Sequence, residues 1–265
     1  MSACVDIELM PTGGWNEEDC VRYLCPREVD LYASISNRER RKKWVCGRLL
    51  TKHLFLSRQQ VGRATGANRW PPRVARIDRL SVDEFPESSY RALEVTSTDR
   101  GRGGAPTLRC QGPTRPTSLS VSHMTGLSGA YVDDSRHVGL DLETLSPRHP
   151  SFYRMSFSHS EHHWIELITR TAEVEDTVLY TLLWCLKESV LKSQSSDQLT
   201  LWRIPHIEVE LRCAPADLLP ALRTPGLEGP LFGCELGVRV FGRNQAGKAA
   251  LGVFQGVVLT AVRLC

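Results

Sequence analysis

The sequence predicts an α+β fold built from helices and antiparallel strands. Helical periodicity fills one stretch from about residue 36 to residue 56 and another from about residue 175 to residue 194. Short apolar or alternating runs bounded by Gly, Pro and Asp predict strands over 118–143 and again after residue 205. Because strands and helices do not alternate regularly, a sheet built from βαβ units is disfavoured.

The length of the chain is compatible with one or two domains, and its charge is unevenly distributed between the two halves. With 265 residues, 41% of them hydrophobic, it can form one large domain or two small ones. Residues 1–136 hold 21 Lys and Arg against 16 Asp and Glu, whereas residues 137–265 hold 12 against 14. A phosphate-rich ligand touching the first half would suit this asymmetry, although a basic surface that keeps the protein soluble is the commoner explanation.

Nine cysteines are scattered singly along the chain, with no CxxC pair, so we expect reduced and mostly buried thiols. The opening MSACVDIELMP lacks the basic and apolar stretches of a signal peptide, and no apolar run approaches the roughly 20 residues of a membrane span. We therefore expect a soluble, cytoplasmic protein that does not contact a membrane.

The first long helix is predicted to be basic and amphipathic. Ser36 and Glu39 have the spacing of a capping box. Apolar residues then repeat at helical spacing on one face: Val45, Leu49, Leu50 and Leu54. Basic residues share a neighbouring face: Arg41, Arg48 and Lys52.

Three consecutive strands are predicted after a Gly- and Pro-rich region, at 118–123, 129–132 and 138–143. Alternation in the last strand, VGLDLE, places Asp141 and Glu143 on one face, which Gly139 leaves open. The acids are ordinary strand-end residues if taken alone. His123 ends the first of these strands and is by default a structural histidine, but it lies directly upstream of the acidic strand.

The second long helix carries an apolar stripe of five residues: Leu179, Leu182, Leu183, Leu186 and Val190. Trp184, Glu188 and Lys192 stack on the other side at i, i+4 and i+8. An exposed Glu–Lys pair is the simplest interpretation, but Trp184 makes this side partly apolar, so we expect partly buried charges. Glu188 then joins Asp141 and Glu143 in a set of three carboxylates that suits Mg²⁺.

Two further motifs are interpreted as structural. GRNQAGKA, residues 242–249, fits GxxxxGK but lacks the hydroxyl of a phosphate-binding loop, so we expect a polar hairpin turn. HSEHH places His159 and His163 at i and i+4 without a third ligand, which indicates a helix start at Ser158 with solvated histidines. The chain after residue 205 is predicted to form antiparallel strands.

VGLDLE followed by WCLKESVLK, residues 184–192, resembles the two-part signature of the 4'-phosphopantetheinyl transferase superfamily. SLSVSHMTG is similar to that family's SxSH segment, and GAPTL, residues 104–108, to its G-K/R-P loop. The length of the chain is similar to that of the Sfp type of this superfamily. This resemblance implies two similar α/β halves related by a pseudo-twofold axis, each with a small antiparallel sheet packed on a long helix. The halves would be residues 1–136 and 137–265, in one monomer with coenzyme A bound between them.

The resemblance also implies a reaction and its residues. The phosphopantetheine arm of coenzyme A would pass to a serine of an acyl or peptidyl carrier domain, releasing adenosine 3',5'-bisphosphate. Asp141, Glu143 and Glu188 would hold Mg²⁺, and Glu188 would take the serine proton. Lys192 would offset charge on the leaving group, with assistance from Lys187.

Contacts to the 3'-phosphate end of coenzyme A are implied for four residues: Arg40, Lys43, Ser122 and His123. In the GAPTL loop Ala105 stands where the family usually has a basic residue, so that contact is either missing or supplied by Arg102. Two alternatives remain: another Mg²⁺-dependent phosphotransferase, or a non-catalytic relative that binds RNA or carrier proteins. Nucleic acid is disfavoured because the basic helix offers only Trp44 and Phe55 for base stacking.

Overall fold

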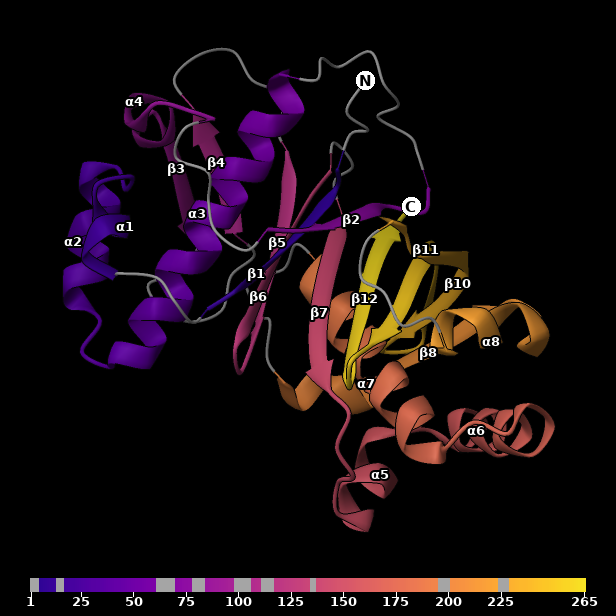
Figure 1. The fold of residues 1–265 in the computed structure, drawn as a ribbon. Helices are drawn as coiled ribbons and strands as arrows, with labels where there is room; N and C mark the ends of the chain where they lie inside the picture. Colours follow the sequence, from indigo (N-terminus) through magenta and orange to yellow (C-terminus); the bar gives the residue numbers. More distant parts are fainter. Residues whose placement is uncertain are drawn as a thin grey trace.

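The structure is a computed structural model that describes residues 5–12, 17–60, 70–77, 84–97, 106–110, 117–133, 137–194, 201–223 and 229–265. Its fold is α+β, with two sheets between helices (Figure 1). Elements up to residue 133 are β1 (Ile7–Pro11), α1 (Glu17–Val21), α2 (Pro26–Ser34), α3 (Arg38–Gln60), β2 (Arg73–Arg76), α4 (Glu87–Arg91), β3 (Leu93–Ser97), β4 (Pro106–Cys110), β5 (Ser118–Met124) and β6 (Leu127–Asp133).

The elements after residue 137 begin with the acidic strand. They are β7 (Val138–Thr144), α5 (Pro150–Ser156), α6 (His159–Ala172), α7 (Asp176–Ser193), the 3-10 helix η1 (Leu201–His206), β8 (Ile207–Arg212), α8 (Pro215–Arg223), β9 (Gly229–Pro230), β10 (Phe232–Val240), β11 (Arg243–Phe254) and β12 (Val257–Leu264). The predicted strands around residues 118–143 and the predicted helix over 175–194 are therefore confirmed.

The first sheet has seven strands in the order β3-β4-β5-β6-β1-β2-β9. It is not purely antiparallel as expected, because β1 and β2 pair in parallel. The connection between them runs through α1, α2 and α3, and such a crossover is what parallel neighbours require. The two-residue strand β9 joins this sheet from the other half of the chain.

The second sheet has five strands in the order β7-β12-β11-β10-β8, all of them antiparallel. The turn between β10 and β11 lies at Phe241 and Gly242, both with positive φ. Most of GRNQAGKA is therefore strand, and only its first residue belongs to the expected hairpin turn. Helix α6 begins at His159 behind a Ser158–Glu161 capping box, with His159 and His163 exposed, as predicted.

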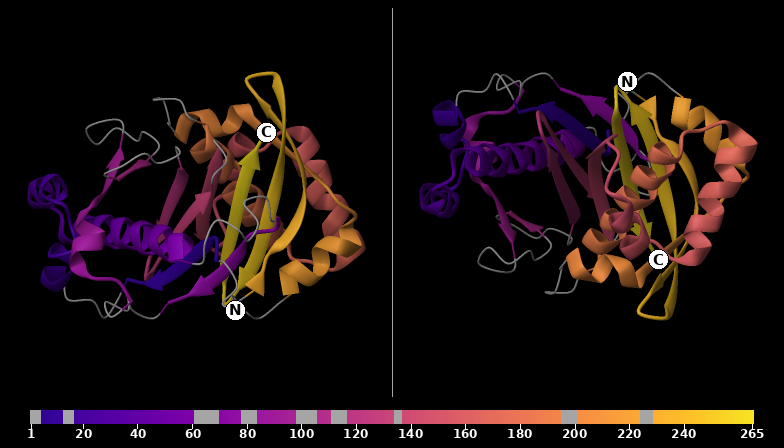
Figure 2. Two further views of the ribbon diagram at one scale, coloured as in Figure 1. Left: turned by 90° about the horizontal axis from the view of Figure 1, so that it is seen from above. Right: turned by 90° about the horizontal axis from the view of Figure 1, so that it is seen from below.

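Three apolar clusters stack the elements into four layers. One fills the space between α3 and the first sheet, one lies between the two sheets, and one lies between the second sheet and α6, α7 and α8. Views along the layers show α3 on one outer side and the C-terminal helices on the other (Figure 2). Strands β1 and β7 both contribute to the middle cluster, so the two halves share it.

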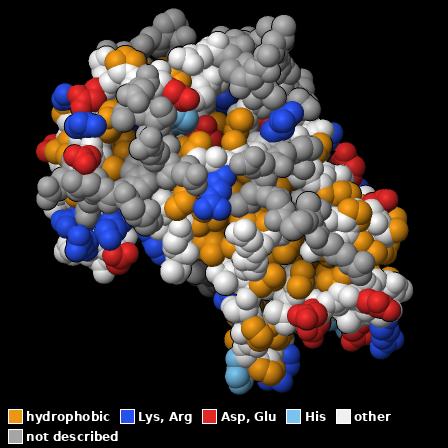
Figure 3. All heavy atoms as spheres, viewed as in Figure 1, with side chains coloured by type: hydrophobic (Ala, Val, Ile, Leu, Met, Phe, Trp, Pro, Cys, Tyr) orange, Lys and Arg blue, Asp and Glu red, His pale blue; other side chains and the backbone are white. Residues whose placement is uncertain are grey.

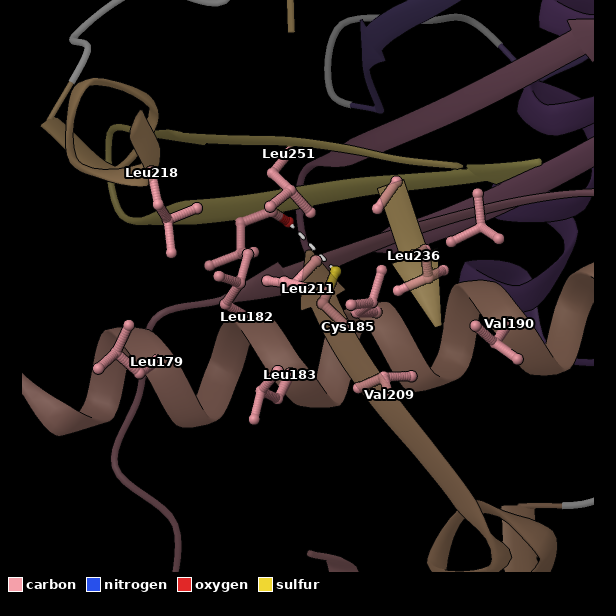
Figure 4. Packing of buried hydrophobic residues seen from close by; sticks show 14 of the residues in the cluster. Leu179, Leu182, Leu183, Cys185, Val190, Val209, Leu211, Leu218, Leu236 and Leu251 are labelled. Carbon is pink, nitrogen blue, oxygen red and sulfur yellow. Dashed lines mark hydrogen bonds between the residues drawn. The ribbon is translucent and has the colours of Figure 1, made fainter. Parts of the chain in front are cut away.

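The apolar stripe predicted on α7 is fully buried. Leu179, Leu182 and Leu183 pack with residues of β8, β10 and β11, and Val190 continues the stripe toward the helix end (Figure 4). Cys185 lies on the sheet side, where its thiol donates to a backbone oxygen of β12. Helix α7 is consequently held against the second sheet along its whole length.

Helix α3 differs from expectation at two points. Its cap is Asn37 rather than Ser36, because the Asn37 side chain accepts the N–H of Arg40 at 2.9 Å and the helix starts at Arg38. Lys52 is fully buried, not part of a basic surface, and it pairs with Glu28. Lys and Arg side chains do gather over the first turns of α3, at the lower left of Figure 3.

Two further observations concern composition. None of the eight described cysteines forms a disulfide, and four of them are buried: Cys20, Cys25, Cys46 and Cys185. Among the described helices, none combines the length and apolar character needed to cross a bilayer.

Candidate active site

The site begins with the packing of α7 on β7. A side chain at Gly139 would place its Cβ 2.7 Å from the carbonyl carbon of Ser189 and overlapping that carbonyl's oxygen. The expectation that Gly139 leaves an open face is therefore wrong. Its missing side chain instead allows the backbone of α7 to touch the strand, which brings residues of the two elements within reach of each other.

Three carboxylates meet where the strand and the helix are in contact. Asp141 and Glu143 on β7 and Glu188 on α7 each offer an oxygen within 4.8 Å of the others. Asp141 is buried, whereas Glu143 and Glu188 are half-buried. Oδ2 of Asp141 is buried without a hydrogen-bond partner among the described residues, so the cluster has an unfilled acceptor at its centre.

Two of the carboxylates, Glu143 and Glu188, have a raised pKa. Burial, together with the charges of Asp141 and Glu143, raises the pKa of Glu188 to about 7. Burial and the charge of Asp141 likewise raise the pKa of Glu143. The cations of Lys192 and Arg148 oppose both shifts without cancelling them. A further cation between the carboxylates would relieve this repulsion.

Lys192 is the cation closest to the cluster, one helical turn after Glu188. Its Nζ lies 2.6 Å from Asp141 Oδ1 and 3.1 Å from Ser122 Oγ. Burial alone would lower the pKa of Lys192, but the carboxylates of Asp141 and Glu188 outweigh it, so the pKa is raised. The ammonium group is thus held charged at the edge of the cluster.

Ser122 links the cluster to the first half of the chain. Its hydroxyl donates to Asp141 Oδ1 at 2.9 Å and accepts the backbone N–H of Leu142 at 3.2 Å. Two residues earlier, the Ser120 hydroxyl accepts the N–H of Leu140 at 2.9 Å. Serine side chains of β5 therefore bond the backbone of β7 between the two sheets.

His123, next to Ser122, lines a groove of about 650 Å³. Arg40, Lys43 and Trp44 of α3 line the same groove, and the first two are predicted to bind coenzyme A. Nδ1 of His123 is 2.8 Å from Ser128 Oγ. Burial, reinforced by the charge of Lys192, lowers the pKa of His123 to about 3, so the ring is neutral. The groove therefore combines the cations of Arg40 and Lys43 with the carboxylate of Glu39 and a neutral imidazole, and His123 directly follows Ser122, which contacts the cluster.

One predicted catalytic residue, Lys187, is not brought to the cluster. Lys187 is fully buried on another side of α7, where its Nζ contacts Glu161 at 2.7 Å and the Ser156 carbonyl at 2.6 Å. Arg102 and Ala105 lie outside the described residues.

Arg148 also contacts the cluster, although it was not among the predicted site residues. Its Nη2 lies 3.0 Å from Glu143 Oε2, and its guanidinium lies over the ring of Trp184, which itself donates to Glu143 Oε1 at 3.1 Å. Arg148 stands in the loop between β7 and α5, outside any periodic pattern, so no sequence signal pointed to it. Glu143 is held from two sides and turned toward Glu188.

Residues 137–219 match the model of one protein family, described as the 4'-phosphopantetheinyl transferase superfamily. The match covers less than a third of the chain, and it shows that these residues are similar to a domain of that superfamily. The matched stretch includes the three carboxylates, Lys187 and Lys192, whereas the groove residues on α3 and β5 precede it. No curated protein matches the chain significantly.

Gly139→Ala is expected to lower the free energy of unfolding by about 3 kcal/mol or more, because the added methyl collides with a backbone carbonyl that cannot swing away. Chemical denaturation measures the change. Gly237→Ala is the matched control: its new Cβ meets only the exposed side chains of Glu210 and Arg212, and a change within about 0.5 kcal/mol is expected. Equal losses in both variants would contradict the close approach of α7 to β7.

His123→Asn is expected to make the protein less sensitive to acid. Because the folded-state pKa of about 3 lies below the ordinary 6.5, the unfolded chain binds a proton that the folded chain rejects as pH falls from 6.5. This difference removes roughly 2 kcal/mol of stability between pH 6.5 and pH 5. Denaturation of wild type and variant at several pH values measures it. The exposed His163→Asn should leave the pH dependence unchanged, and identical slopes for His123→Asn and wild type would refute a buried neutral ring.

Proposed function

We propose that this chain transfers the 4'-phosphopantetheine moiety of coenzyme A to a serine of an acyl or peptidyl carrier protein domain, releasing adenosine 3',5'-bisphosphate. The observation that carries the proposal is the carboxylate cluster beside Lys192, inside the matched stretch and next to Ser122, whose neighbour His123 lines the groove on α3. Residues of both halves line this region. We therefore propose that one chain forms a complete site and acts as a monomer.

The described residues fit a bound Mg²⁺. Asp141, Glu143 and Glu188 offer only carboxylate oxygens, and Asp141 Oδ2 lacks a partner. Mg²⁺ prefers such oxygen donors and usually binds through one or two carboxylates together with substrate phosphates. When bound there, Mg²⁺ would supply positive charge against the pyrophosphate of coenzyme A and so favour attack on the phosphorus next to the pantetheine arm.

The groove on α3 is proposed to bind the 3'-phosphate end of coenzyme A. Arg40 and Lys43 are the cations that line it, and the neutral ring of His123 has a hydrogen-bonding nitrogen to offer a phosphate oxygen. Ser122 lies between this groove and the cluster. The pyrophosphate would then extend from the groove toward Lys192.

Glu188 is proposed to accept the proton of the attacking carrier serine. Its raised pKa, about 7, makes its carboxylate a stronger base than an exposed glutamate at neutral pH. Lys192 stays charged and is proposed to stabilise negative charge on the departing adenosine 3',5'-bisphosphate. Trp184 and Arg148 orient Glu143 beside them.

Intact-mass spectrometry tests this function directly. Apo carrier domains from fatty acid, polyketide and nonribosomal peptide systems are incubated with the protein, coenzyme A and Mg²⁺, with and without a chelator. We expect one carrier class to gain the mass of one phosphopantetheine and the chelator to prevent the gain. Glu188→Gln should slow transfer by roughly 100-fold or more, because both a metal ligand and the base are lost.

The exposed Glu166→Gln on α6 serves as the control and should transfer at the wild-type rate. Transfer that survives the chelator would contradict the metal requirement. Full activity of Glu188→Gln would remove Glu188 from the reaction. Absence of any mass gain on every carrier would overturn the proposed function.

A further inference from the structure

Lys187 belongs to a buried network of four polar contacts. Its Nζ donates to Glu161 and to the carbonyl of Ser156. Glu161 Oε2 also accepts the N–H of Ser158, at 2.8 Å, and Oε1 accepts the N–H of Val209 on β8, at 3.1 Å. One carboxylate therefore joins the start of α6, the middle of α7 and the edge of the second sheet. We call Glu161 and Lys187 the second clamp.

The first half contains the same arrangement, the first clamp, formed by Glu28 and Lys52. Glu28 Oε2 accepts the N–H of Cys25 at 3.0 Å and pairs with Lys52, while Oε1 accepts the N–H of Val95 on β3 at 2.9 Å. Lys52 also donates to the carbonyl of Tyr23 at 3.2 Å. Both lysines are fully buried, with an exposed fraction of 0%.

The two clamps agree in their sequence offsets. Each glutamate stands three residues after the capping residue whose N–H it accepts (28 − 25 and 161 − 158). Each stands five residues after the residue whose carbonyl its lysine contacts (28 − 23 and 161 − 156). Both glutamates also accept a strand N–H with the remaining oxygen. The correspondence therefore covers four contacts in each half.

The residue after each clamp lysine faces an acidic residue of a strand. His53 follows Lys52, and its Nδ1 lies 2.9 Å from Glu8 Oε2 on β1. Glu188 follows Lys187 and meets Glu143 and Asp141 on β7. From strand glutamate to clamp lysine the separation is 44 residues in both halves (52 − 8 and 187 − 143).

Comparison with the first clamp distinguishes two possible roles for Lys187: contact with a substrate, and orientation of the next helix residue. Within the described residues, the carboxylate cluster is found at β7 and α7 and has no counterpart of three metal-ligating groups beside Lys52. The first clamp makes the same contacts without such a cluster beside it. The two clamps therefore share the orientation of the next helix residue toward a strand. Contact with a substrate is not part of that shared role.

We propose that the Glu161–Lys187 pair is a positioning device that fixes the rotation of α7 so that Glu188 faces Asp141 and Glu143, and that Lys187 acts through Glu188 without touching substrate. The part of this inference that concerns turnover rests on the proposed function. The part that concerns metal binding rests only on the carboxylate cluster. Glu28–Lys52 is the same device in the first half, where it orients His53 toward Glu8.

A double-mutant cycle with a matched cycle in the other half tests the proposal. Among the described residues, Lys187→Met leaves the buried carboxylate of Glu161 without an ion-pair partner, whereas Lys52→Met leaves Glu28 beside Arg48 at 3.9 Å. Tm should therefore fall by roughly 10 °C in the first variant and by less in the second. Isothermal titration with Mg²⁺ should then distinguish them. Lys187→Met is expected to weaken Mg²⁺ binding by about 10- to 100-fold, as loss of a residue that orients a metal ligand does, whereas Lys52→Met should change it less than about twofold.

Adding Glu161→Gln removes the unpaired charge from Lys187→Met. The double variant E161Q/K187M should recover Tm, because no buried charge is left unpaired, whereas Mg²⁺ affinity and kcat should stay lowered, because the ion pair that fixes the rotation of α7 is still missing. The KM for coenzyme A should stay within about twofold in Lys187→Met, because the groove on α3 is untouched. The matched double variant E28Q/K52M should recover Tm while its Mg²⁺ affinity remains that of wild type.

Four results would overturn the proposal. Normal Mg²⁺ affinity in Lys187→Met, together with lost turnover, would place Lys187 in contact with substrate. Equal weakening by Lys52→Met would make the effect one of global stability. An unfolded E161Q/K187M would make the pair a requirement for folding, and an unchanged Lys187→Met would remove any role. If wild type transfers nothing to any carrier, the proposed function fails, and the Mg²⁺ and Tm measurements still decide the role of the clamp.

Discussion

The close contact between the backbone of α7 and strand β7 is the constraint on which the site depends. It exists because Gly139 has no side chain where the Ser189 carbonyl lies against the strand. With the two backbones this close, Asp141 and Glu143 reach Glu188, and Lys192 reaches Asp141 one turn further along. The apolar stripe of α7 holds the same helix against the second sheet over its whole length. The contact of α7 with β7 and its packing on the sheet thus bring the three carboxylates and Lys192 together.

Bringing like charges together has a cost, and the surrounding residues offset only part of it. Lys192 and Arg148 oppose the repulsion, and the Ser122 hydroxyl donates to Asp141, yet the pKa of Glu188 remains raised and Asp141 Oδ2 remains unpaired. A cluster that is left under-compensated in this way is typical of a functional site rather than of a stabilising ion-pair network. Ser122 adjoins the cluster from β5, and His123, the next residue of that strand, lines the groove on α3.

Much of this arrangement could be predicted from sequence because it rests on local periodicity. Alternation along VGLDLE put Asp141 and Glu143 on one face, and helical spacing put Glu188 and Lys192 on one side of α7. What failed depended on partners distant in the chain. The resemblance implied a role for Lys187 beside Lys192, but the direction of Lys187 is set by Glu161 on α6, and Lys52 is buried because Glu28 lies opposite it.

Other differences have similar causes. A gap at Gly139 looks like open space in a strand pattern and is filled only when the neighbouring helix is known. The parallel pairing of β1 with β2 depends on the helical crossover between them, and the two-residue strand β9 has no pattern of its own. Asn37 replaces Ser36 as the cap because adjacent polar residues compete for one position, and sequence spacing does not rank them.

The most direct measurement is a crystal structure of the protein grown with coenzyme A and Mn²⁺ in place of Mg²⁺, with anomalous scattering used to locate the metal. A single anomalous peak bound by oxygens of Asp141, Glu143 and Glu188, with the pyrophosphate on its open side and the 3'-phosphate in the groove beside Lys43 and His123, is the predicted result. Coenzyme A bound with no metal between these carboxylates, or a metal held elsewhere on the chain, would contradict the assignment of this cluster as the metal centre.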